Sequence, residues 1–119
     1  MPAAHLNKGE QAERLAEQQV IAAGFDIVAR NVHSRFGEID LIAQKNNLLV
    51  FIEVRFRSNS QFGSALESVS VQKQRKVIKA AQYFLANNSS LNKLHMRFDV
   101  IGIDAQNRVQ WIEGAFQTS

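Results

Sequence analysis

The sequence predicts a mixed α/β fold, with one β-sheet of about five strands flanked by helices. Apolar residues recur at helical spacing within residues 12–23 and 77–85, and five other segments are rich in β-branched and aromatic residues. With 119 residues, of which 45% are hydrophobic and 21% charged, the chain suits one globular domain spanning 1–119. The expected order of elements is α-β-β-β-α-β-β.

The first half of the chain predicts one helix and three strands. The helix covers about Lys8 to Ala23, because its apolar residues follow the i, i+3, i+4 pattern and Gly24 supplies a C-terminal stop. A short Asn-Asn turn at residues 46–47 separates the second strand from the third. The three strands are expected at residues 25–32, 37–44 and 48–56.

The second half predicts another helix and two closing strands. The segment from Arg57 to Ser64 is polar and contains Gly63, so we expect a loop there that could close over a substrate. Ser70 is a suitable N-cap for the helix that follows. The last two strands are expected at residues 95–103 and 108–112, where Asp99 and Trp111 are expected to have structural roles.

Composition narrows the possible functions. The absence of cysteine excludes disulfides and thiolate metal sites. Residues 1–10 lack the apolar core of a signal peptide, and no apolar run approaches the ~18 residues of a membrane span, so we expect a cytoplasmic protein without a membrane partner. The net charge of +3 and the pI of about 9.6 favour a polyanionic partner.

The hairpin formed by the second and third strands carries the candidate chemistry. A two-residue turn at 46–47 would place Asp40 directly opposite Glu53, and Glu38 opposite Arg55 as its expected partner. Opposed carboxylates need a proton, a donor or a cation between them, and Mg²⁺ or Mn²⁺ prefers carboxylate oxygen ligands. The alternative is a purely structural arrangement of solvated acids at a sheet edge. The other face of the second strand should be apolar and include Ile39, Leu41 and Ala43.

Several motifs together resemble the YraN-like family of small bacterial proteins. They are GEIDLIA at 37–43, LVFIEVRFR at 49–57, Gly-Glu at 9–10, Asn31 and RFDVI at 97–101. That family is similar to the archaeal Holliday-junction resolvases and to restriction-endonuclease-like folds, whose signature is Asp, a gap and then Glu-x-Lys.

The resemblance implies a metal-dependent nuclease that hydrolyses DNA, including branched or damaged DNA. Asp40 and Glu53 would be the ligands of Mg²⁺ or Mn²⁺, and Glu10 would be an auxiliary catalytic acid. For Glu10 a simpler role in stabilising the start of its helix stays open. The resemblance also implies a homodimer.

Arg55 departs from the signature, which has lysine at that position. Arginine can hold a phosphate in a bidentate contact, but with a pKa above about 12 an arginine side chain cannot serve as a base. Arg55 would therefore steady the phosphate in an active enzyme. Two alternatives remain: a non-catalytic nucleic-acid-binding module that keeps the nuclease fold, and a protein-interaction domain without a nucleic-acid role.

Basic side chains at the start of the second helix predict contacts with a nucleic-acid backbone. Cations in the first turn oppose the helix dipole, which suggests that they serve a negative partner, although a solvated helix face is the simpler alternative. The expected nucleic-acid-binding residues are Arg57, Lys73, Arg75, Lys76 and Lys79.

Overall fold

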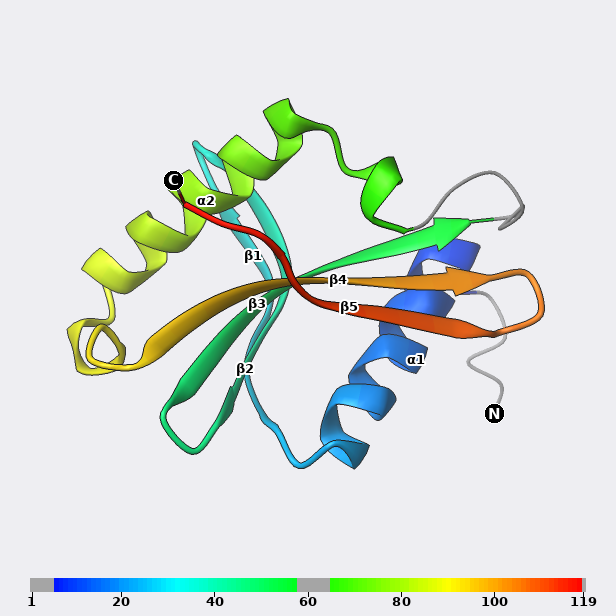
Figure 1. The fold of residues 1–119 in the computed structure, drawn as a ribbon, viewed down its shortest axis with the longest axis horizontal. Helices are drawn as coiled ribbons and strands as arrows, with labels where there is room; N and C mark the ends of the chain where they lie inside the picture. Colours follow the sequence, from blue (N-terminus) through cyan, green and yellow to red (C-terminus); the bar gives the residue numbers. More distant parts are fainter. Residues whose placement is uncertain (1–5, 58–64, 119) are drawn as a thin grey trace.

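The computed structural model describes residues 6–57 and 65–118, which form one five-stranded sheet with a helix on each face (Figure 1). The helices are α1 (Lys8–Ala22) and α2 (Val71–Ala86). The strands are β1 (Asp26–Ser34), β2 (Gly37–Lys45), β3 (Leu48–Arg57), β4 (His95–Asp104) and β5 (Val109–Phe116), with 3₁₀ turns η1 (Leu66–Ser68) and η2 (Ser89–Leu91). The predicted order α-β-β-β-α-β-β is confirmed. The expected loop at 57–64 lies outside the described residues after its first position.

The strands lie side by side in chain order, β1-β2-β3-β4-β5. The pairs β1–β2, β2–β3 and β4–β5 are antiparallel and close through short turns, whereas β3 and β4 are parallel. Parallel neighbours need a crossover connection, and here η1 and α2 belong to it. Helix α2 therefore returns the chain across one face of the sheet, where it lies mainly against β2 and also contacts β1.

Each helix begins at a side-chain cap, of which only the one at Ser70 was predicted. In α1 the Asn7 side chain accepts a hydrogen bond from the backbone N–H of Glu10, and the Glu10 carboxylate accepts one from the Asn7 N–H, a complete capping box. Gly24 follows the helix with φ +94°, which favours glycine. In α2 the Ser70 side chain accepts from the N–H of Lys73, confirming the predicted N-cap.

Two apolar layers cover the two faces of the sheet. On the α2 side, Leu49 and Phe51 of β3 pack with Val77 and other α2 residues. On the α1 side, Val50 and Ile52 pack with the buried α1 residues, which are Ala12, Ala16 and Val20. Because β3 is covered on both faces, a charged side chain near its middle must be buried with its partners. None of the helices in the described ranges is long and apolar enough to span a membrane.

Candidate functional site

Asp40 lies where the ladder between β2 and β3 ends. The predicted register is confirmed from Lys45 opposite Leu48 to Leu41 opposite Ile52, but the ladder does not reach the predicted pair of Asp40 and Glu53. One step further, the N–H of Val54 donates to Oδ2 of Asp40 at 2.8 Å. The Asp40 carboxylate therefore supplies the acceptor for β3 at the point where backbone pairing stops.

The strand is irregular at this point, and this is why the carboxylate can reach β3. Ile39 packs on the α2 side together with Ile42, whereas Leu41 between them faces α1. The prediction that Ile39 shares a face with Leu41 is therefore wrong. On the neighbouring strand β1, Asn31 adopts φ +49°, an uncommon conformation for a residue in the middle of a strand. The side chains of β2 do not alternate strictly between the two faces of the sheet, because both strands are distorted next to Asp40.

Glu53 is the most deeply buried acid at the site. It is only 2% exposed, and its Oε2 atom has no hydrogen-bond partner in the described parts of the chain. The other oxygen, Oε1, lies 3.6 Å from Nζ of Lys73. Burial, followed by the negative charge of Asp40, raises the pKa of Glu53 to about 8, while Lys73 acts in the opposite direction. Burial and the charge of Asp40 therefore favour the protonated form of Glu53 when no cation is bound.

The pKa of Asp40 is raised as well, for the same physical reason. Burial raises its pKa, while the hydrogen bond from Val54 and the charge of Lys73 lower it. Arg55 also lowers the pKa of both acids, but to a smaller extent than Lys73 does. The site thus consists of two carboxyl groups in a poorly hydrated position, with one ammonium group between the sheet and α2.

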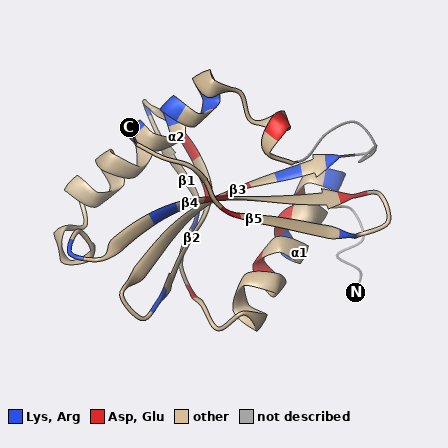
Figure 2. Ribbon diagram, viewed as in Figure 1, with Lys and Arg blue, Asp and Glu red and all other residues tan. Residues whose placement is uncertain are grey.

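The two cations near the acids have different roles in the structure. Nε of Arg55 donates to Oγ of Ser68 at 3.2 Å, which ties β3 to the η1 turn. Lys73 arrives from the first turn of α2 and is the cation in contact with Glu53. Lys73 therefore differs from its predicted companions on α2, which are exposed to solvent: Arg75, Lys76 and Lys79. Figure 2 shows the basic positions gathered in the part of α2 that follows η1.

The predicted ion pair between Glu38 and Arg55 is wrong. Oε1 of Glu38 lies 3.0 Å from Nδ1 of His33, which is its neighbour on β1. Since the β2–β3 ladder ends at Leu41, the register that would have faced Glu38 toward Arg55 does not extend that far. The last predicted cation, Arg57, ends β3 and is in register with Asp104 of β4.

Glu13 of α1 is another acid near Asp40, and it was not among the predicted site residues. Burial, followed by the charge of Asp40, raises the pKa of Glu13, and a hydrogen bond with the Asn31 side chain lowers it. Glu10, one turn earlier, is held in the capping box with Asn7. The sequence contained a signal for Glu13, because this residue directly follows Ala12 and so borders the stripe of small residues that packs against the sheet.

A surface hollow lies beside Glu13, between α1 and the first two strands. Its lining includes Glu10, Glu13 and Asn31, together with Leu41 of β2. At its rim Glu17 forms a short ion pair with Arg30, in which Nε lies 2.6 Å from Oε1. The α1 side of the site is therefore open to solvent, whereas Glu53 is enclosed.

Within residues 6–57 and 65–118, no group of three or more His, Cys, Asp or Glu residues is arranged to hold a metal ion. The pair Asp40 and Glu53 is the sequence-predicted ligand set, and the structure brings these two acids within electrostatic range of each other. The free Oε2 of Glu53 is the feature that suits a cation, because a buried acceptor without a donor is unfavourable.

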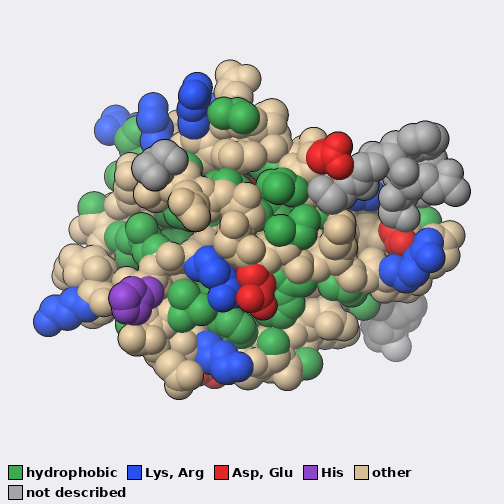
Figure 3. All heavy atoms as spheres, in the orientation of Figure 1, with side chains coloured by type: hydrophobic (Ala, Val, Ile, Leu, Met, Phe, Trp, Pro, Cys, Tyr) green, Lys and Arg blue, Asp and Glu red, His purple; other side chains and the backbone are tan. Residues whose placement is uncertain are grey.

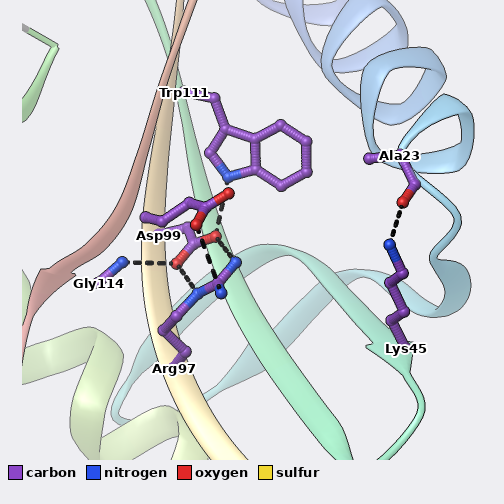
Figure 4. A network of polar contacts seen from close by, with 7 residues as sticks. Ala23, Lys45, Arg97, Asp99, Trp111 and Gly114 are labelled. Atoms are coloured by element: carbon purple, nitrogen blue, oxygen red, sulfur yellow. Dashed lines mark hydrogen bonds and ion pairs between the residues drawn. The ribbon is translucent and has the colours of Figure 1, made fainter.

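Asp99 is a second buried acid, and it shows the opposite pattern (Figure 4). Arg97 binds it through two hydrogen bonds of 2.8 Å, and Nε1 of Trp111 and the N–H of Gly114 donate to it at 2.8 and 2.9 Å. Both carboxylate oxygens are satisfied by the protein itself. The expected structural roles of Asp99 and Trp111 agree with these contacts, and they set Glu53 apart.

Comparisons with known proteins support the family resemblance. The family described as "Uncharacterised protein family UPF0102" matches residues 12–103. A UPF0102 protein of Saccharophagus degradans is 52% identical over 114 residues, covering 96% of each chain. A UPF0102 protein of Nitrosococcus oceani is 43% identical over 119 residues, covering 98% of this chain and 96% of the relative. One from Legionella pneumophila is 44% identical over 110 residues, covering 92% and 93%.

Proposed function

The chain belongs to the UPF0102 family, and we propose that it is a metal-dependent nuclease that hydrolyses phosphodiester bonds in DNA. The observation that carries the proposal is the state of Glu53. Its buried carboxyl group lies beside that of Asp40, and one oxygen has no partner among the residues described. Purely structural buried acids are normally satisfied by the protein, as Asp99 is here.

Asp40 and Glu53 fit a divalent ion by their chemistry. Both are carboxylates, and hard cations such as Mg²⁺ and Mn²⁺ prefer oxygen ligands. When bound, the ion would supply positive charge to a phosphodiester and lower the pKa of the attacking water. The hydrogen bond from Val54 fixes one oxygen of Asp40 and leaves the other available.

Lys73 would supply the ammonium group that the signature lysine provides in related nucleases. Its ammonium group reaches Glu53 from helix α2, whereas Arg55 occupies the position two residues after Glu53 where the signature has its lysine. An ammonium group placed there can stabilise charge that develops on the phosphate, and it can orient a water molecule. Arg55, bonded to Ser68, would mainly hold the η1 turn in place.

The test is a cleavage assay with purified protein in Mn²⁺ and labelled single-stranded, duplex, flap and four-way-junction DNA. We expect cleavage by the wild type and its loss in Asp40→Asn. Asp26→Asn is a matched control, because Asp26 is exposed at the start of β1 and outside the site. The proposal fails if no substrate is cleaved, or if Asp40→Asn cleaves as well as the control.

A non-catalytic nucleic-acid-binding module is the second candidate. It is favoured by the hydrogen bond from Arg55 to Ser68, because this contact engages the Arg55 side chain with the η1 turn rather than with the two acids. If this candidate is correct, calorimetry with Mn²⁺ should show little heat of binding, while DNA should bind in a salt-dependent manner. Cleavage restored by Arg55→Lys, with unchanged DNA affinity, would show that this member lost only its chemistry.

A further inference from the structure

We propose that a surface beside the acid site binds unpaired nucleotides of a single strand. The surface, here termed the aromatic–basic surface, consists of Arg35, Phe36, Lys76, Lys79 and Tyr83. The inference rests on the proposed function in that it names the form of nucleic acid presented to the acid site. Binding itself, however, needs neither a metal ion nor cleavage.

An exposed aromatic ring is the first feature of this surface. Tyr83, in the last turn of the sheet-covering helix α2, is 46% exposed. Its ring lies 5.5 Å from that of Phe36, at an interplanar angle of 56°. The guanidinium carbon of Arg35 lies 4.9 Å from the centre of the Phe36 ring on the same hairpin. The two tilted rings and the guanidinium group thus form one platform, in which the exposed ring of Tyr83 is available for stacking.

The platform is held together by close packing between the β1–β2 turn and α2. A Cβ atom at Gly37 would lie 3.3 Å from Cβ of Lys76, so the backbone of the turn lies against the helix there. The acid of this turn, Glu38, is paired with His33 rather than directed at the lysines. The turn and the helix therefore present their aromatic and basic side chains as one surface.

The aromatic–basic surface leads toward the acid site along one side of α2. Lys73, Lys76 and Tyr83 are spaced by three and seven residues, about one and two helical turns, which places them along one side of α2. Lys73 contacts Glu53 at one end, and Tyr83 is ten residues further, about 15 Å at 1.5 Å per residue. A short extended strand can span this distance. Figure 3 shows Lys and Arg side chains projecting from this edge of the molecule, with hydrophobic side chains among them.

Unpaired nucleotides fit this combination better than a duplex does. Aromatic side chains bind the faces of bases, which are accessible in a single strand and covered in a duplex. Lysines alone would bind the phosphates of either form. The exposed ring next to the exposed lysines is therefore the feature that selects strands with unpaired bases, such as flaps, gaps and frayed ends.

The experiment measures binding in EDTA, where no metal-dependent cleavage can occur. Fluorescence anisotropy compares a labelled oligothymidylate with a labelled duplex of the same length. We expect Tyr83→Ala to weaken single-strand binding by about tenfold or more and duplex binding by less than about twofold. Tyr83→Phe should bind like the wild type, because the ring is kept. Lys76→Gln should weaken both substrates, since phosphates are common to them.

Controls separate this inference from the proposed nuclease and from misfolding. Thermal unfolding establishes that Tyr83→Ala remains folded, and the comparison with the duplex provides an internal reference in the same sample. Asp26→Asn, the control variant of the cleavage assay, should bind the oligothymidylate like the wild type. The inference is overturned if Tyr83→Ala binds the single strand normally, or loses both substrates equally. Absence of cleavage alongside ring-dependent binding would refute only the nuclease.

Discussion

Glu53→Gln should change how the stability of the metal-free protein depends on pH. The folded chain raises the pKa of Glu53 from 4.5 to about 8, chiefly through burial. Between these two values the folded state keeps a proton that the unfolded state has released. Stability from this group is therefore fully present below about pH 4.5 and is lost as pH rises toward about 8. Glutamine cannot ionise, so the variant lacks this loss.

The magnitude follows from the two pKa values. A group that titrates at 4.5 when unfolded and at about 8 when folded lowers the free energy of unfolding by roughly 3–4 kcal/mol between about pH 5 and about pH 8. Asp40 and Glu13, whose pKa values are also raised, contribute in the same direction and remain in the variant. The difference between wild type and variant therefore reports the titration of Glu53 together with its effect on the neighbouring Asp40, and we expect it to shift by about this amount in favour of the variant.

Urea unfolding followed by circular dichroism measures this difference at each pH, in buffers containing EDTA. Asp26→Asn is the matched control, because Asp26 is an exposed acid at the start of β1 and lies outside the acid site. A second series in Mn²⁺ should lessen the alkaline loss in the wild type, since an ion that binds only the folded state stabilises it. Parallel pH curves for wild type and Glu53→Gln would refute the reasoning about the buried acid.

Three further substitutions test other parts of the structure. Lys73→Gln should lower the cleavage rate by about a hundredfold while changing DNA affinity by less than about threefold; equal losses in both assays would make Lys73 a simple backbone contact. Asp99→Ala should lower the free energy of unfolding by about 3 kcal/mol, because Arg97 and other donors lose their buried acceptor; urea titration measures this, and a loss below about 1 kcal/mol would contradict it. Gly102→Ala should destabilise by about 1–3 kcal/mol, because the added methyl would meet the Cβ of Ala65; an unchanged thermal midpoint would show that the η1 region yields.

Much of the fold could be predicted from local patterns. The Asn pair at 46–47 fixed the hairpin register, and Asn46 indeed adopts φ +55°. Ser70 marked the start of α2 correctly. β5 continues to Phe116, beyond the predicted end at Ile112, because Gly114 remains attached through its N–H to the buried Asp99. A glycine is ordinarily a signal to end a strand, and a contact with a residue far away in the sequence overrides that signal here.

The candidate site could be predicted only in part, for the same physical reason. Asp40 and Glu53 were identified because alternation and register are local properties of a hairpin. The contact between Lys73 and Glu53 depends on how α2 crosses the sheet, which no local pattern specifies. Glu13 could have been favoured over Glu10 from the sequence, because it borders the α1 stripe of Ala12 and Ala16, whereas Glu10 is held in the capping box.

The hydrogen bond between Val54 and Asp40 makes one backbone amide a spectroscopic reporter of the site. The proton of this amide is bound to a carboxylate oxygen at a nitrogen–oxygen distance of 2.8 Å, so its resonance frequency depends on the charge of that carboxylate. In a ¹⁵N-labelled sample, the Val54 cross-peak should therefore move when Asp40 takes up a proton or a cation. A single peak in a two-dimensional spectrum then follows the occupancy of the acid pair in the unmodified protein, without a substrate and without a mutation.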